Sequence, residues 1–178
     1  MYLMHYGIKG MKWGVRRTPE QLGHRKRSAK QLSKSMRSFK YKEFDKLMSP
    51  EEVKRSKRGS CHDQVMYELD YLRKAGYKPR ATFLMEYDDN GQGGMTHSFV
   101  HYQKNGKTYW VENAWTERAG ITVYDSLNDI KKAIRRAHKT GEFGNKKRYS
   151  HLTFAKFDDR KHRPGESLQE LVDRCFRS

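Results

Sequence analysis

The chain of 178 residues has few cysteines and few prolines, and its 21 acidic side chains are outnumbered by 38 Lys and Arg. Its two cysteines, Cys61 and Cys175, do not make a disulfide framework, so we expect free thiols in a reducing compartment. A run of about 18 apolar residues is also missing, and we expect neither a transmembrane helix nor a membrane partner. The N-terminus lacks the unbroken apolar stretch of a secretory signal.

Acidic residues are scarce mainly in the N-terminal third. Residues 1–58 hold 17 Lys and Arg against 5 Asp and Glu, a net charge of +12, whereas residues 59–178 hold 21 against 16. We therefore divide the chain into an N-terminal segment (1–17), a basic helical arm (18–58) and a domain (59–178). Such an arm binds nucleic acid, an acidic protein or an anionic surface, or is only a solvated helical face.

A candidate nucleophile stands at the start of the domain. Cys61 follows a Gly-Ser turn, and the apolar residues after it recur at helical spacing until Gly76. These apolar residues are Val65, Met66, Leu69 and Leu72. Unpaired N–H groups at a helix N-terminus favour negative charge, so a thiol in this position loses its proton more easily.

A β-hairpin downstream supplies a base and a group to orient it. Residues 95–102 and 107–115 are predicted strands around the turn Asn105-Gly106. A hairpin centred there pairs residues whose numbers sum to about 211, and we expect His97 and Asn113 to lie close together near its open end. Cysteine, histidine and asparagine in this order indicate a cysteine nucleophile site.

Other residues were weighed for the same roles. His101 lies four residues deeper on the strand of His97, and His62 stands beside the nucleophile on what we expect to be an exposed turn. Glu112 is the second choice for the third residue, because a regular strand points it away from Asn113. Asp63 is predicted to cap the Cys61 helix.

The sequence Gly59-Ser60-Cys61-His62-Asp63, with the later segment Leu72–Arg80, resembles the transglutaminase-like superfamily. The segment Tyr109–Trp115 is similar to papain-like cysteine proteases. The likeness covers residues 59–115. It implies an α+β fold in which an antiparallel sheet packs against the nucleophile-bearing helix, and acyl transfer through a thioester on Cys61.

The chain departs from the superfamily pattern at two positions. Asn113 stands where the superfamily usually has Asp, and Arg55 stands where a glutamine would precede the nucleophile. The oxyanion donors would then be backbone N–H groups, Gln64 or another side chain. Trp115 would shield the pair of His97 and Asn113 from water or contact substrate.

Residues 1–17 resemble a short segment of bacteriophage and prophage proteins. We therefore expect a phage- or prophage-encoded, cysteine-dependent hydrolase (protease, isopeptidase or deamidase) acting on a protein or peptide, without metal or cofactor. It would work in the bacterial cytoplasm or in association with the virion. The alternative is a nucleic-acid- or virion-binding protein that uses residues 1–58 and has a non-catalytic scaffold.

Periodicity also predicts the remaining elements of the chain. Ser49-Pro50-Glu51-Glu52 reads as a capping box at the start of a short helix. Three further strands, over 81–87, 121–124 and 152–157, and two further helices, from 125 or 126 to 137 and over 166–176, complete the expected α+β domain.

Overall fold

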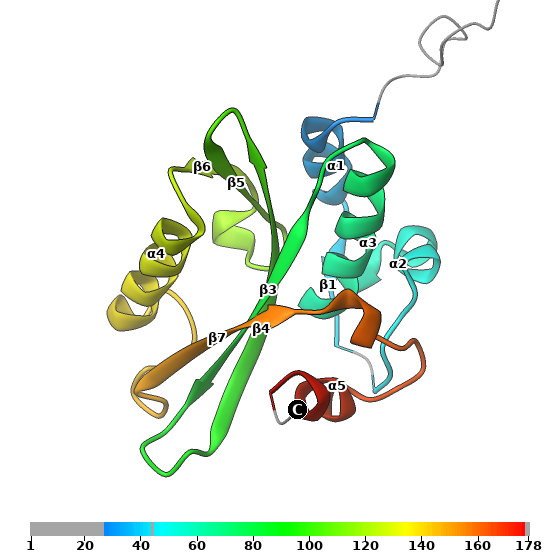
Figure 1. The fold of residues 1–178 in the computed structure, drawn as a ribbon. Helices are drawn as coiled ribbons and strands as arrows, with labels where there is room; N and C mark the ends of the chain where they lie inside the picture. The colour runs from blue at the N-terminus through cyan, green and yellow to red at the C-terminus, as the bar shows by residue number, and fades with distance from the viewer. Residues whose placement is uncertain (1–26, 44, 177–178) are drawn as a thin grey trace, which may run out of the picture.

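A computed structural model describes residues 27–43 and 45–176. These residues form an α+β fold around a five-stranded sheet with the order β6-β5-β4-β3-β7, in which all neighbours are antiparallel (Figure 1). The strands are β3 (Arg80–Tyr87), β4 (Gly93–Lys104), β5 (Lys107–Glu112), β6 (Gly120–Tyr124) and β7 (His151–Phe157). The predicted antiparallel α+β arrangement is confirmed.

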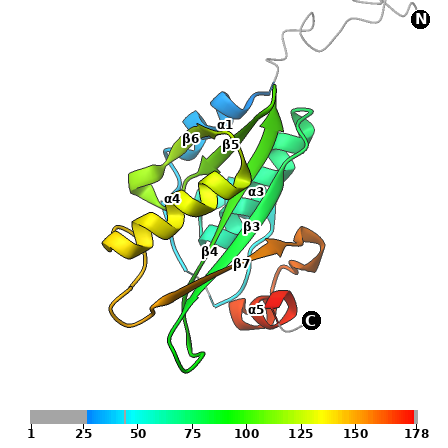
Figure 2. The same cartoon turned by 60° about the vertical axis from the view of Figure 1, so that its left-hand side comes forward.

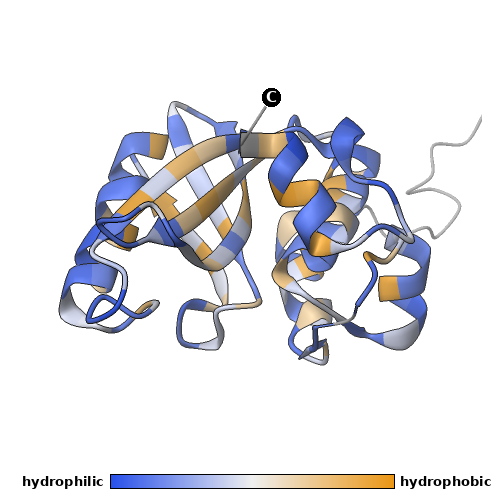
Figure 3. Ribbon diagram, turned by 90° about the horizontal axis from the view of Figure 1, so that it is seen from below, coloured by the Kyte–Doolittle hydropathy of each residue, from blue (hydrophilic) through white to orange (hydrophobic). Residues whose placement is uncertain are grey.

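Helices cover both faces of the sheet. Helix α3 (Cys61–Lys74) lies on one face and α4 (Leu127–Thr140) on the other, as the two views in Figures 1 and 2 show. Side chains on a strand alternate between faces, so Val100 of β4 packs in the core on the α3 side while Phe99 packs on the α4 side. In Figure 3 the hydrophobic colour accordingly follows the sheet and parts of the helices that cover it.

Part of the predicted basic arm belongs to the domain. Helices α1 (Ala29–Met36) and α2 (Pro50–Ser56) place Leu32, Met36 and Val53 in the same core as α3, each at most 1% exposed. Thus the described part of residues 18–58 is not a separate arm, because these apolar residues are buried in the core of the domain. Residues 1–17 and 18–26 lie outside the described residues.

The remaining elements complete the α3 side and the connections. Strands β1 (Lys40–Tyr41) and β2 (Arg58–Gly59) form a short parallel pair that leads into α3. Helix α5 (Leu168–Phe176) closes the chain, and η1 (Thr116–Arg118) and η2 (Asp159–Lys161) are short 3-10 turns. None of the described helices is long and apolar enough to cross a membrane.

The hairpin of β4 and β5 has the predicted register. Asn105 and Gly106 form its turn with φ of 51° and 72°, the left-handed conformation that this turn requires. Paired residues sum to 211 from Lys104 and Lys107 down to Val100 and Val111, where the pairing ends. Beyond that point β4 continues beside β3 alone, and the start of α3 contacts β4 there.

Candidate active site

The start of α3 is held by a network around Asp63. Ser60 caps the helix and accepts from the Asp63 N–H, while the Asp63 Oδ2 accepts from the Ser60 N–H at 2.9 Å. The Asp63 Oδ1 accepts from the Met48 N–H at 2.8 Å and lies 3.9 Å from the His162 Nε2. The predicted capping role of Asp63 is confirmed, and its carboxylate also ties two other chain segments to the nucleophile turn.

Cys61 lies at the first position of α3, only 3% exposed, with its Sγ 3.9 Å from the Thr96 carbonyl oxygen. Burial raises the pKa of the thiol, but charge and hydrogen-bond interactions with His62 and His97 outweigh it and lower the pKa to about 6. The first helical N–H groups have no acceptor within the helix. Ser60 accepts those of Asp63 and Gln64, through its Oγ and its carbonyl oxygen.

His97 is paired with a buried carboxylate. Its Nε2 lies 2.8 Å from the Glu112 Oε2, and the two side chains are 7% and 2% exposed. Burial alone lowers the pKa of His97, but the charge of Glu112 and the contact with Cys61 raise it to about 10. The Glu112 Oε1 accepts from the N–H groups of Asn113 and Trp115 at 2.9 and 3.0 Å, which fixes the carboxylate.

The predicted pairing of His97 with Asn113 is wrong. In a register that sums to 211, His97 stands opposite position 114, so its face is shared by the even positions of β5. Glu112 therefore lies on the side of His97, and Asn113 points to the other face, where its Nδ2 donates to the Gln64 Oε1 at 2.5 Å. The predicted register of the hairpin is therefore right, but the prediction put Asn113 on the wrong face of the sheet.

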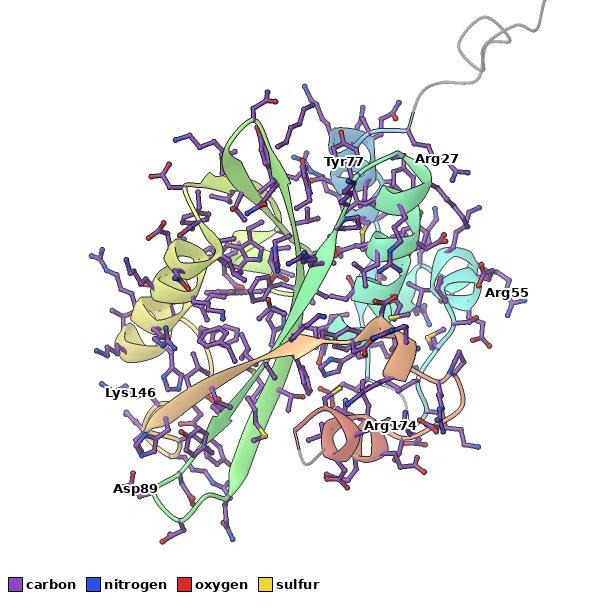
Figure 4. The ribbon with its side chains drawn as sticks, viewed as in Figure 1. Arg27, Arg55, Tyr77, Asp89, Lys146 and Arg174 are labelled. Atoms are coloured by element: carbon purple, nitrogen blue, oxygen red, sulfur yellow. The ribbon has the colours of Figure 1, made fainter. Side chains whose placement is uncertain are left out.

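Gln64 does not serve as a free oxyanion donor. It is 2% exposed, its Nε2 donates to the Gly59 carbonyl oxygen at 2.9 Å, and its Oε1 accepts from Asn113. Gln64 and Asn113 thus connect the nucleophile turn to the end of β5. Arg55, which occupies the position of the superfamily glutamine, lies on α2 and points away from the molecule (Figure 4).

The two other histidines considered as the base, His62 and His101, are placed differently from His97. His62 is 1% exposed rather than on an exposed turn, and its ring nitrogens lie 2.7 Å from the Ser98 Oγ and 3.2 Å from the Thr96 Oγ1. His101 is hydrogen bonded to Thr82, and burial with nearby cationic side chains lowers its pKa to about 4. Within the described residues, His97 is the histidine that combines the thiol with a carboxylate.

A cavity of about 420 Å³ gives access to the thiol, and we call it the Cys61 pocket. Cys61, His97 and Trp115 line it. Tyr41 and Glu43 also line it, with the Tyr41 hydroxyl 2.6 Å from the Glu43 Oε1. No sequence pattern indicates these two residues, because Tyr41 ends a strand of only two residues and Glu43 follows that strand.

Glu68 is a second buried carboxyl group near the site. It is 2% exposed on α3, and burial together with the charge of Glu112 raises its pKa well above the usual range. Its position two helical turns after Cys61, on the apolar side of the helix, was a signal that sequence reasoning could have used.

A family model matches a short N-terminal stretch of the chain. Residues 1–20 match the model of a family of unknown function, DUF7211. No curated protein matches the chain. The resemblance of residues 1–17 to phage proteins stays a prediction.

The fold is similar to solved structures of Legionella pneumophila LapG. One has a TM-score of 0.40 and 15% identity over 53% of this chain and 55% of that one. An EGTA-treated LapG has a TM-score of 0.39 and 15% identity over 52% and 53%. The chain thus spans about half the length of these structures.

In the described residues, no group of three or more His, Cys, Asp and Glu side chains is placed to hold a metal ion.

Proposed function

We propose that the protein is a cysteine-dependent hydrolase of protein or peptide amide bonds, with Cys61 as nucleophile, His97 as acid and base, and Glu112 as the group that orients His97. The single observation that carries this proposal is the buried chain of contacts from thiol to imidazole to carboxylate, open to a pocket at the thiol. A thiol with a pKa of about 6 is largely a thiolate at neutral pH.

The first half of the reaction is acylation. The Cys61 sulfur attacks the carbonyl carbon, and the carbonyl oxygen becomes an oxyanion that accepts a hydrogen bond from the N–H of Cys61 at the helix N-terminus. Since the His97 Nε2 is engaged with Glu112, the nitrogen left to serve the reaction is Nδ1. It gives its proton to the leaving amine as the C–N bond breaks, and a thioester remains.

The second half is hydrolysis of the thioester. The neutral His97 takes a proton from water, whose oxygen attacks the thioester carbonyl, and the C–S bond then breaks to release a carboxylic acid and the thiolate. The Glu112 carboxylate stabilises the imidazolium in both halves and keeps the proton on Nε2 whenever the ring is neutral. An amine in place of water would give transamidation by the same residues.

The test is cleavage of a complex peptide library by the full chain, with new amino termini identified by mass spectrometry. We expect new termini with the parent protein and with Cys175→Ser, and none with Cys61→Ala or His97→Ala. Cleavage that survives both of these substitutions would contradict the proposal. Cross-linked products without new termini would assign the site to acyl transfer onto amines.

A further inference from the structure

The lining of the Cys61 pocket has the opposite charge from the chain as a whole. The chain carries a net charge of +17, yet the described residues that line the pocket include three glutamates and neither lysine nor arginine. The glutamates are Glu43 after β1, Glu117 in η1 and Glu142 after α4. Three separate segments therefore each contribute a glutamate to the lining of one cavity.

Two of these three carboxylates are not neutralised. Glu142 forms an ion pair with Arg118 at 3.2 Å. Glu43 and Glu117 accept only hydroxyl hydrogen bonds, from Tyr41 at 2.6 Å and from Thr116 at 3.2 Å, and neither has an ion pair among the described residues. A hydroxyl donor leaves the full negative charge of a carboxylate in place, so the pocket attracts cations.

The rest of the wall suits the stem of a long cationic side chain. Met95, Trp115 and Phe143 line the pocket, and the Trp115 and Phe143 ring centroids are 4.6 Å apart. The Arg118 guanidinium already lies 5.4 Å from the Trp115 ring centroid, so this ring accepts a cation on its face. Lysine and arginine combine an apolar stem with a charged head that remains at a polar rim.

We propose that the substrate carries a lysine or arginine next to the bond that is cleaved, with Glu43 and Glu117 as specificity-determining residues. This inference rests on the proposed function, because only an enzyme has a substrate. The electrostatic preference of the pocket is a property of the free protein. The ligand class is a basic peptide segment, whose stem packs on Trp115 and whose charge meets the two carboxylates.

The first test reads the charge preference at the thiol without any turnover. In a Cys175→Ser background, Cys61 is modified with the cationic aminoethyl and the anionic sulfonatoethyl methanethiosulfonate, each of which forms a mixed disulfide and releases methanesulfinate. We expect the cationic-to-anionic rate ratio to fall roughly tenfold in the double variant Glu43→Gln/Glu117→Gln. The matched control Glu51→Gln, an exposed glutamate of α2, should leave the ratio unchanged. An unchanged ratio in the double variant would overturn the proposal.

The second test uses peptides that differ only beside the cleaved bond. We expect a kcat/KM at least about tenfold higher for peptides with arginine or lysine than for those with alanine, and a loss of that preference in the double variant and at high salt. Equal cleavage of neutral and basic peptides overturns the specificity inference while the proposed function stands. If peptides of every charge remain uncut, the proposed function fails, and the reagent ratio still decides whether the pocket selects cations.

Discussion

Replacing Glu112 by glutamine separates the role of this residue from that of Asn113. The glutamine carbonyl oxygen can still accept from the two backbone N–H groups that now bond the Glu112 Oε1. Its amide nitrogen then faces the His97 Nε2 and donates to it, so the ring proton moves to Nδ1, the nitrogen that must take the thiol proton. Glu112→Gln therefore leaves the backbone contacts in place and removes the imidazolium.

The magnitude follows from the pKa of the thiol. The imidazolium of His97 is one of two histidine contributions that bring Cys61 to about 6 against burial. Without it we expect the pKa of Cys61 to rise by about 2 units, which is about 2.7 kcal/mol. The assay is the pH dependence of iodoacetamide alkylation in a Cys175→Ser background. At pH 7 the alkylation rate should fall by up to about tenfold as the thiolate fraction falls.

Asn113→Ala is the matched comparison, because its side chain bonds Gln64 and not His97. We expect the alkylation profile of this variant to stay within about half a pKa unit of the parent. The reasoning would be refuted if Asn113→Ala shifted the profile upward while Glu112→Gln left it unchanged.

Three further predictions concern stability, measured by urea unfolding. Asp63→Asn should lower the free energy of unfolding at pH 7 by about 2 kcal/mol, because a buried acceptor of several bonds loses its charge. Hydrogen bonds outweigh burial and hold the pKa of Asp63 in the folded chain below its usual value, so this difference should begin to shrink as the pH falls through the ordinary aspartate range and vanish below the lowered pKa of the folded state. Glu68→Gln should stabilise the protein increasingly as the pH rises above the ordinary glutamate pKa. The reason is that the unfolded chain then releases the Glu68 proton, whereas the folded chain retains it. An equal effect of the substitution at pH 4 and pH 7 would contradict this. Leu72→Ala, at a fully buried α3 position, should cost about 3 kcal/mol, and a loss below about 1 kcal/mol would be inconsistent with the packing.

Local sequence patterns predicted most of the helices and strands of the fold. The turn Asn105-Gly106 set the hairpin register to the residue, and the capping box at Ser49 set the start of α2, because both signals depend on neighbouring residues only. The packing of α1 against the sheet domain could not be read in the same way. Its apolar residues are few, and only the tertiary structure shows that they are buried.

The site was predicted in part. Cys61 and His97 line the same pocket, as expected. Glu112 rather than Asn113 bonds His97, because residues along β5 alternate between faces and the register places the even positions of β5 on the face of His97. Tyr41 and Glu43 reach the pocket through tertiary contacts alone. A short sequence motif holds no information on such contacts.

The most direct measurement compares the two cysteines of the unmodified protein. At pH 6.5 a thiol with a pKa of about 6 is about three quarters thiolate, whereas burial raises the pKa of Cys175 above that of an ordinary thiol and so keeps its thiolate fraction much smaller. The lower intrinsic nucleophilicity of a more acidic thiol offsets part of this advantage, so we expect Cys61 to react with iodoacetamide about tenfold faster. Labelling at each cysteine is quantified by mass spectrometry over time. Faster labelling of Cys61 is the result that the account predicts, and labelling of Cys175 at an equal or greater rate would contradict it.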